Sequence, residues 1–164
     1  MRHRFMLTAP VLWRPVAEDP QTRPPMPADA NALGALLLDA YRGTPDDEGE
    51  SPADARRIVR ELFAGAAGPL MWAVSEVTAR EGRLVSAVLV TLWQDLPLVA
   101  QLATLPDHQR QGLARAGLVR CINRLAAGDE PELRLVVTQG NHRAEALYES
   151  LGFVPVPQPP FTSA

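Results

Sequence analysis

The sequence contains one cysteine and no lysine. Cys121 by itself rules out a disulfide within the chain and a metal site built from several thiolates. The 16 basic residues, all of them arginine, are outnumbered by 19 acidic ones, and the formal net charge is -3. Proteins that bind nucleic acid usually carry a basic excess on one face. This balance therefore favours a small molecule or a peptide as partner and argues against nucleic acid.

Long apolar runs are also absent. No stretch approaches the roughly 20 consecutive apolar residues of a membrane-spanning helix, and residues 1–15 lack the continuous apolar segment of a signal peptide. We therefore expect no membrane association and a cytoplasmic location. The length of 164 residues is that of one ordinary domain, so we expect residues 1–164 to form a single domain with one core.

The distribution of proline and of apolar residues predicts the order of helices and strands. Prolines crowd residues 1–30, so this segment should be an irregular lead-in with at most a short strand near Phe5 to Trp13. Apolar residues at helical spacing predict helices, and β-branched, partly alternating segments predict strands. The expected helices lie around residues 33–41, 52–63, 118–125 and 144–151, and the expected strands are residues 71–78, 84–93, 98–105 and 133–138.

This order predicts an α/β (α+β) fold with a mixed central sheet and about four helices. Short turns join the first three strands, which should form an antiparallel meander. The strand at Leu133 follows a helix and should run parallel to the third meander strand, where we expect the sheet to open. The tail after Phe153 has room for one short edge strand at Val154 to Val156. Either the N-terminal segment or a second copy of the chain, in a homodimer, would cover that edge.

The turn from Gln109 to Arg115 is the strongest candidate for a ligand site. It joins the third meander strand to a helix, and Gly112 and Ala114 are small enough for a ligand to approach the backbone. The first N–H groups of a helix have no partner within it and the helix dipole is positive there, so such a start binds phosphate. Arg110 adds positive charge. A tight turn beside a solvated helix face explains the same residues equally well.

Two motifs resemble signatures of the GNAT acetyltransferase family. Residues 109–114 read Gln-x-x-Gly-x-Ala, similar to the family's motif Gln/Arg-x-x-Gly-x-Gly/Ala after a strand. Residues 141–148 read Asn-x-x-Ala-x-x-Leu-Tyr and are followed by Gly-Phe at 152–153, which looks like its second signature. The resemblance covers about residues 72–153. It implies the GNAT fold, acetyl-CoA as acetyl donor, and N-acetyl transfer to a primary amine of a small molecule or peptide.

The resemblance also implies which residues bind acetyl-CoA. Main-chain N–H groups of Arg110 to Arg115 should hold the pyrophosphate, and the end of the third meander strand should pair with pantetheine where it splays at a bulge. Asn141 should tie its helix to the pantetheine wall, although helix capping explains this residue as well. The implied contacts are Leu102, Ala103, Thr104, Gln109, Arg110, Gln111, Gly112, Leu113, Ala114, Arg115, Asn141, Ala144 and Tyr148.

Acetyl transfer to an amine requires a deprotonated amine, a donor for the oxyanion and a proton for the departing thiolate. The resemblance assigns the proton to Tyr148, because a side chain with an ordinary pKa of about 10 stays protonated at neutral pH. The helical spacing of Tyr148 would also suit simple packing of its ring. The main-chain N–H near Thr104 is the oxyanion donor that the resemblance implies.

The base has two alternative sources, because the strand at residues 98–105 offers Gln101 but no carboxylate. One is Glu76 on the first meander strand. The other is the acidic loop, residues 44–50, which could attract a cationic amine and relay its proton through water. Its acidic residues are Asp46, Asp47, Glu48 and Glu50, of which we take Glu48 as the candidate base. A loop that is merely solvated explains these charges more simply.

Two other functions remain open at this point. A GNAT-like domain could bind acyl-CoA without turnover and act as a sensor or an interaction module. Ala114 in place of the second glycine and the missing strand carboxylate leave room for that role. A plain interaction domain, whose basic strip contacts an acidic partner, is the third alternative.

Overall fold

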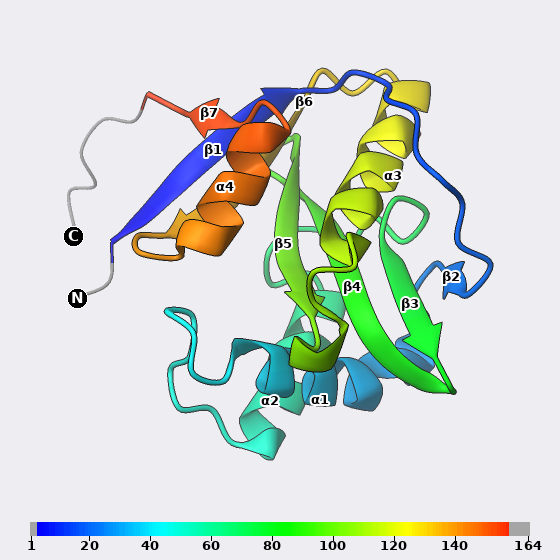
Figure 1. Cartoon of the computed structure of the whole chain (residues 1–164), viewed down its shortest axis with the longest axis vertical. Coiled ribbons are helices and arrows are strands. Elements are labelled where there is room, and N and C mark those ends of the chain that lie inside the picture. The colour runs from blue at the N-terminus through cyan, green and yellow to red at the C-terminus, as the bar shows by residue number, and fades with distance from the viewer. Residues whose placement is uncertain (1–2, 158–164) are drawn as a thin grey trace.

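The computed structural model describes residues 3–157, in which seven strands form one mixed sheet with helices on both faces (Figure 1). The predicted α/β fold is confirmed. The strands are β1 (Arg4–Pro10), β2 (Thr22–Arg23), β3 (Glu76–Arg80), β4 (Arg83–Trp93), β5 (Leu96–Thr104), β6 (Glu132–Thr138) and β7 (Val154–Pro155). The α-helices are α1 (Ala30–Tyr41), α2 (Pro52–Phe63), α3 (Leu113–Ala127) and α4 (His142–Ser150), and short 3-10 turns cover Pro27–Asp29 and Pro106–His108.

The strand order across the sheet is β2-β3-β4-β5-β6-β1-β7. Strands β3, β4 and β5 form the predicted antiparallel meander, and β6 runs parallel to β5. Strand β1 lies between β6 and β7 and is antiparallel to both. Of the two candidates for the edge beside β6, the N-terminal segment is therefore the one that occupies it.

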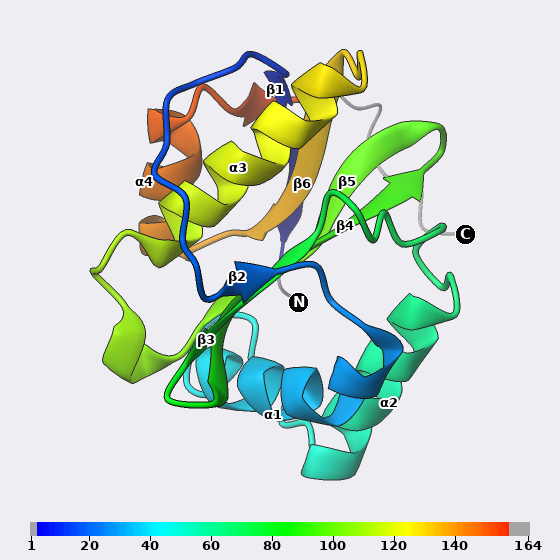
Figure 2. The same cartoon turned by 90° about the vertical axis from the view of Figure 1, so that its right-hand side faces the viewer.

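The sheet separates two apolar layers, as Figure 2 shows: α1 and α2 cover one face, and α3 and α4 cover the other. Leu118 of α3 is fully buried against Leu135 of β6 in the layer under α3 and α4. In the other layer, Leu33 of α1 and Val59 of α2 are fully buried with Leu89 of β4. Burial of such a side chain stabilises the fold by about 1.5–3 kcal/mol, so both layers fix the sheet from which the candidate site extends.

The predicted start of α2 is confirmed in detail. The Ser51 hydroxyl accepts a hydrogen bond from the Asp54 N–H at 3.1 Å, and the Asp54 carboxylate accepts one from the Ser51 N–H at 2.9 Å. This is a capping box with Pro52 at the first helical position. It fixes where the acidic loop ends, because that loop runs into Ser51.

The lead-in is more regular than its prolines suggested. Strand β1 pairs with β6 along its whole length, and β2 adds a short strand at the opposite edge of the sheet, beside β3. Between them the chain runs beside α3 (Figure 2). The main chain of Arg14 exchanges two hydrogen bonds with the Asn123 side chain, at 2.9 and 2.8 Å, and Arg120 donates to the Ala17 carbonyl at 2.9 Å. Side chains of α3 therefore satisfy a backbone that proline keeps extended.

Strand β3 begins later than predicted. Residues 71–74 form a turn instead of a strand, and the Ser75 N–H donates to the Met71 carbonyl at 2.9 Å. The Ser75 hydroxyl accepts a hydrogen bond from the Val90 N–H at 2.9 Å. The Ser75 side chain therefore bonds to the Val90 N–H, which a longer β3 would need for strand pairing. Apolar composition alone did not distinguish this turn from a strand.

Candidate active site

Strands β5 and β6 are paired over only two residues and then separate. The last pair joins Val99 of β5 to Leu135 of β6. Beyond it, β5 continues to Thr104 paired with β4, and β6 continues to Thr138 paired with β1. The facing edges of β5 and β6 thus carry main-chain groups that neither strand uses for the other. This is the opening that the sequence predicted between these two strands.

A β-bulge in β5 lies at the point of separation. The register between β4 and β5 shifts there, so that Ala100 has no residue opposite it. A bulge bends its strand and increases the local twist, and here it precedes the segment that leaves β6. The bulge was expected among residues 102–104, but it lies at Ala100, before the residues that were expected to face pantetheine.

The turn after β5 presents the start of α3 to this opening. Arg110 and Gly112 both have left-handed backbone, with φ of 63° and 76°, and α3 begins directly after Gly112. The first helical hydrogen bond is donated by the Ala116 N–H to the Gly112 carbonyl at 3.0 Å. The N–H groups of residues 113–115 therefore lie at the open end of the helix, where an anion is favoured.

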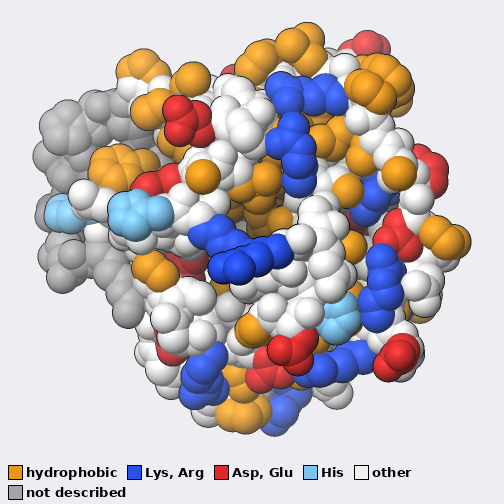
Figure 3. Space-filling model, viewed as in Figure 1, with side chains coloured by type: hydrophobic (Ala, Val, Ile, Leu, Met, Phe, Trp, Pro, Cys, Tyr) orange, Lys and Arg blue, Asp and Glu red, His pale blue; other side chains and the backbone are white. Residues whose placement is uncertain are grey.

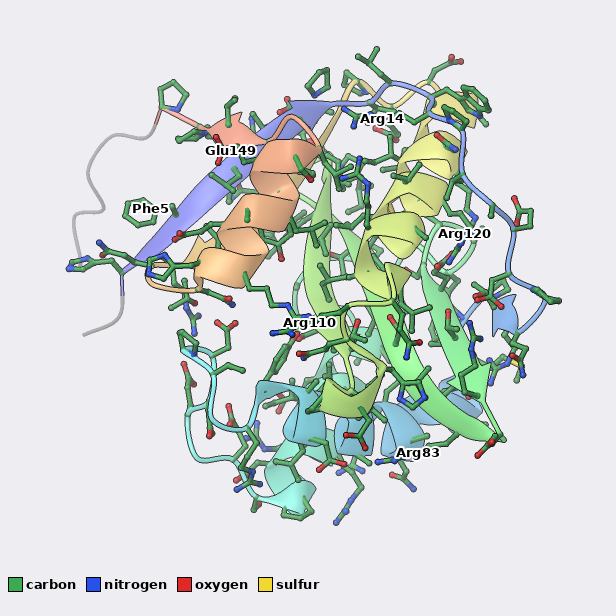
Figure 4. The ribbon with its side chains drawn as sticks, viewed as in Figure 1. Phe5, Arg14, Arg83, Arg110, Arg120 and Glu149 are labelled. Carbon is green, nitrogen blue, oxygen red and sulfur yellow. The ribbon has the colours of Figure 1, made fainter. Side chains whose placement is uncertain are left out.

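Arginines surround this helix start. Arg110 reaches from the turn toward the first turn of α4 (Figure 4). Arg115 of α3 donates to the Ser150 hydroxyl of α4 at 2.7 Å, and Arg143 of α4 donates to the Gln109 side chain. Figure 3 shows arginines on either side of a hollow with an apolar floor, over the space between α3 and α4. The hollow thus joins positive charge to an apolar surface.

Gln109 holds the turn to the end of β5. Its side-chain amide donates to the Thr104 carbonyl at 3.3 Å, while its oxygen accepts from Arg143. The position therefore links β5, the turn and α4. Gln111, by contrast, is exposed.

Helix α4 is capped by Asn141, whose side chain accepts a hydrogen bond from the Ala144 N–H at 3.3 Å. Tyr148, one turn after Ala144, is only 7% exposed, and its ring packs edge-on against Phe153 with centroids 5.9 Å apart. Burial, and secondly the charge of Asp46, raise the pKa of Tyr148 to about 12. The phenol is therefore protonated throughout the physiological pH range.

Tyr41 is a site residue that sequence reasoning missed. Its hydroxyl lies 2.8 Å from the Gln101 side-chain oxygen and 3.0 Å from the Leu102 carbonyl, and these two acceptors share its single proton. Burial and the neighbouring Tyr148 and Asp46 raise its pKa well above the ordinary value. The sequence showed only that Tyr41 lies on the apolar face of its helix, and no local pattern distinguishes packing there from a bond to β5.

The acidic loop reaches the opening from the other side. The Asp46 carboxylate accepts a hydrogen bond from the Thr138 hydroxyl at 2.6 Å and one from the Asn141 side chain at 3.3 Å. Thr138 is the last residue of β6, and Asn141 caps α4. A purely solvated loop is therefore not what the structure contains, at least at Asp46.

Glu76 does not fit the role of base. It is 2% exposed and lies beneath α3, where its carboxylate accepts hydrogen bonds from Arg120 at 2.8 Å and from Arg124 at 2.9 Å. A β-carbon added at Gly117 would come within 3.0 Å of Glu76 Oε1, so the helix backbone also closes over it. Both oxygens serve a buried ion cluster that anchors α3 to the sheet, and we withdraw Glu76 as a catalytic candidate.

Glu48 lies on the rim of the opening. Its side chain is 57% exposed and forms an ion pair of 2.8 Å with Arg4 at the start of β1. The Asp46 carboxylate, by contrast, accepts hydrogen bonds from Thr138 of β6 and from Asn141 at the start of α4. Glu48, which the sequence suggested as the base, is exposed and paired with Arg4, and we withdraw it as a catalytic candidate.

A second groove, of about 400 Å³, lies between α1 and the turn from β3 to β4. Its charged residues are already matched: Arg23 forms an ion pair of 2.7 Å with Asp29, and Arg83 one of 3.5 Å with Asp39. It contains none of the predicted site residues. We therefore place the candidate active site at the opening between β5 and β6.

A mixed α/β sheet that splays beside the open start of a helix is the architecture of this chain, and a helix start of this kind favours anions. The chain belongs to the GNAT acetyltransferase family. The model of the Acetyltransferase (GNAT) family matches residues 32–153, which run from within α1 to beyond the end of α4. The resemblance seen in the two sequence motifs is confirmed.

Two relatives are similar in sequence. The chain is 38% identical over 74 residues to a ribosomal-protein alanine N-acetyltransferase of Escherichia coli, a match that covers 45% of this chain and 50% of that protein. It is 32% identical over 134 residues to the mycothiol acetyltransferase of Beutenbergia cavernae, with 79% of this chain and 42% of that protein covered. The chain thus spans about half the length of the relatives it matches.

A solved structure with the same fold is a GNAT acetyltransferase from Brucella melitensis in complex with acetyl-CoA. Its TM-score is 0.60 at 18% identity, and the match covers 85% of this chain and 88% of that chain. This likeness shows the fold. Among residues 3–157, no helix combines the length and the apolar character needed to cross a bilayer.

Proposed function

We propose that this protein is an acetyl-CoA-dependent N-acetyltransferase that moves an acetyl group to a primary amine of a small molecule or peptide. The proposal rests on one observation. The open edge of β5, the start of α3 and the Tyr148 ring all border the opening between β5 and β6. Acetyl-CoA supplies a thioester, whose carbonyl carbon is the electrophile. Family membership supports this donor, and the relatives named above are acetyltransferases.

The described residues fit a phosphate-bearing thioester. The open N–H groups at residues 113–115 and the neighbouring Arg110 and Arg115 suit the pyrophosphate. The free edge of β5 after the bulge suits the amide-bearing pantetheine arm. The Leu102 carbonyl already accepts from Tyr41 and the Thr104 carbonyl from Gln109, so main-chain N–H groups, and not these two carbonyls, are the proposed partners of the pantetheine arm. The Thr104 N–H remains our candidate for the oxyanion donor.

Tyr148 is the proposed general acid. Its raised pKa keeps the proton on the phenol at neutral pH, so that the hydroxyl can donate it to the sulfur as the carbon–sulfur bond breaks. Ala144 lies one turn earlier on α4, and the Asn141 cap holds this turn in place. The hydroxyl thus approaches the opening from a rigid helix.

Cys121 is not suited to be the nucleophile that would form a covalent acyl-enzyme. This thiol is fully buried in the layer under α3, and burial raises its pKa to about 12. A thiolate is the reactive form of cysteine, and it is strongly disfavoured here. Direct attack of the amine on the thioester is therefore the proposed route.

The acceptor class is tested with a panel of amines. It contains a short peptide that begins with alanine, because one relative acetylates an alanine of a ribosomal protein, together with L-alaninamide, spermidine and an amino sugar. The measurement is release of free thiol from acetyl-CoA. We expect at least one member to raise thiol release tenfold or more above hydrolysis.

Calorimetry with acetyl-CoA tests the donor separately. A dissociation constant in the micromolar range is expected, and no binding at several hundred micromolar would overturn the proposal. Tight binding without thiol release for every amine tested would instead identify an acyl-CoA sensor, the alternative named above.

A further inference from the structure

Asp46 is the acidic residue of the loop that is built into the candidate site. Its two carboxylate oxygens are held by separate elements: one by the Thr138 hydroxyl at the end of β6, at 2.6 Å, and the other by the Asn141 side chain at the start of α4, at 3.3 Å. Asp46 is itself half-buried. An ordinary loop residue has neither fixed position nor two donors from the strand and helix that border the opening.

The same carboxylate acts on both tyrosines of the opening. Its negative charge contributes to the raised pKa of Tyr148 on α4 and to that of Tyr41 on α1. Those two tyrosines are the only ones in the chain. Tyr41 in turn donates to β5 at Leu102. Three elements thus bring a carboxylate and two phenols together at the end of the splayed strands.

We propose that Asp46 is the base of the acetyl transfer and the anchor of a cationic amine acceptor. This inference rests on the proposed function and deepens it. It favours acceptors whose amine is protonated in solution, such as the α-amine of an amino acid amide or peptide, because Asp46 attracts a positive charge. Compounds that offer only an amide nitrogen or a neutral hydroxyl group should be poor acceptors.

The proton balance of the step is as follows. The amine nitrogen forms a bond to the acetyl carbon while the carbon–sulfur bond breaks. Asp46 takes the proton that the nitrogen loses, and the Tyr148 hydroxyl gives its proton to the thiolate sulfur. Afterwards Asp46 returns its proton to the Tyr148 oxygen through water. The net change is amine and acetyl-CoA to amide and CoA thiol, with the protein restored. A substrate that arrives as ammonium first releases one further proton to solvent.

The charge coupling between the two residues gives the sequence of events a direction. Burial is the main cause of the raised pKa of Tyr148, and the charge of ionised Asp46 adds to it. When Asp46 becomes neutral by accepting the proton of the amine, the contribution of its charge to that pKa disappears. Tyr148 is then a stronger acid at the moment when the thiolate leaves. Acceptor deprotonation and donor protonation are thereby linked.

The competing explanation is a purely structural role, in which Asp46 only holds the loop against Thr138 and Asn141. The substitution Asp46→Asn distinguishes the catalytic role from the structural one. An asparagine keeps the size of the side chain and an oxygen that accepts from Thr138, but it carries no charge and takes no proton. The matched control is Glu48→Gln, which removes one negative charge from the same loop at an exposed position.

The kinetic experiment uses L-alaninamide as acceptor and thiol release from acetyl-CoA as readout. We expect Asp46→Asn to lower kcat about 100-fold or more, as loss of a general base does, and to raise the KM for L-alaninamide, with the dissociation constant of acetyl-CoA unchanged within threefold. Glu48→Gln should remain within twofold of the wild type. Equal activity of Asp46→Asn and wild type would overturn the proposal.

A spectroscopic experiment tests the coupling without any acceptor. In the Tyr41→Phe background, Tyr148 is the only tyrosine left, and its ionisation is followed by absorbance at 295 nm after stopped-flow pH jumps. Asp46→Asn should lower the pKa of Tyr148 measurably, and Glu48→Gln should leave it unchanged. An unchanged pKa in Asp46→Asn overturns the relay even if the enzyme is active. Absence of thiol release by the wild type with L-alaninamide overturns the cationic-amine acceptor, while absence of acetyl-CoA binding overturns the proposed function.

Discussion

The two sides of the opening between β5 and β6 are built differently. The proposed donor side consists of consecutive residues, from the free edge of β5 through the turn to the start of α3, and it would bind mainly through main-chain groups. The proposed acceptor side consists of single side chains from separate elements: Tyr41, Asp46, Thr138 and Asn141. A site made of consecutive backbone leaves a motif in the sequence, whereas a site made of distant side chains leaves none.

The largest expected effect is a loss of stability on substitution of Glu76, a carboxylate that lies outside both sides of the opening. Glu76→Gln leaves the buried Arg120 without its charge partner, and breaking such a pair costs about 3–5 kcal/mol. Urea unfolding should show a loss of that order, with activity kept at temperatures where the variant is folded. Replacing both residues, by Glu76→Leu and Arg120→Met, should recover much of the loss. A stable but inactive Glu76→Gln would return Glu76 to the catalytic site.

Tyr148→Phe tests whether the phenol of Tyr148 takes part in the chemistry or only packs in the core. We expect kcat to fall about 100-fold, equivalent to about 2.7 kcal/mol of transition-state stabilisation, because the thiolate loses its acid. The ring and its contact with Phe153 are kept, so calorimetry should give an unchanged affinity for acetyl-CoA. Equal turnover of the two proteins would leave Tyr148 with a packing role only.

The pH dependence of stability gives a second measure of Tyr148. Its pKa is raised from an ordinary value of about 10 to about 12, so the native state holds the proton more tightly than the unfolded chain. The contribution to stability is complete below about pH 10 and falls as the pH rises toward 12, by about 2–3 kcal/mol. Urea unfolding between pH 9 and 11.5 should show a shallower decline in Tyr148→Phe than in the wild type. Parallel declines would contradict the burial of the phenol.

Gly112→Ala tests the turn on the donor side. Gly112 has φ of 76°, and a β-carbon added there would meet nothing within 4 Å. The cost is therefore backbone strain alone, about 1–2 kcal/mol. We expect that loss of stability together with weaker binding of acetyl-CoA, because relaxation of the turn moves the N–H groups of α3. Gly112→Asn is the control, since asparagine tolerates this conformation better; if both variants bind as the wild type does, the turn is not the phosphate site.

The smallest effect is expected on the rim. Arg4 and Glu48 form an exposed ion pair, and such pairs contribute about 0–1 kcal/mol. Glu48→Gln should shift the thermal midpoint by a degree or two at most. A large loss would mean that this pair, and not Asp46, fixes the acidic loop.

The turn before α3 and the opening beside β5 could be predicted from the sequence because their features are local. The turn at residues 109–115 follows from residue types at fixed spacing, and the mixed sheet follows from the order of apolar segments. The ion cluster around Glu76 was missed because its arginines lie on α3, far along the chain. The contact of Asp46 with Thr138 was missed for the same reason. The order of the lead-in was underestimated because proline content says nothing about which distant side chains hold an extended segment.

Strand β1 has a consequence for the way the protein is made. It leaves the ribosome more than 100 residues before its partners β6 and β7. Contacts between distant parts of a chain form slowly, and unpaired strands are prone to aggregate in the meantime. The nascent chain therefore carries an unpaired strand while the residues between β1 and β6 are made. Only when β6 emerges can the sheet close and the opening beside β5 take its shape.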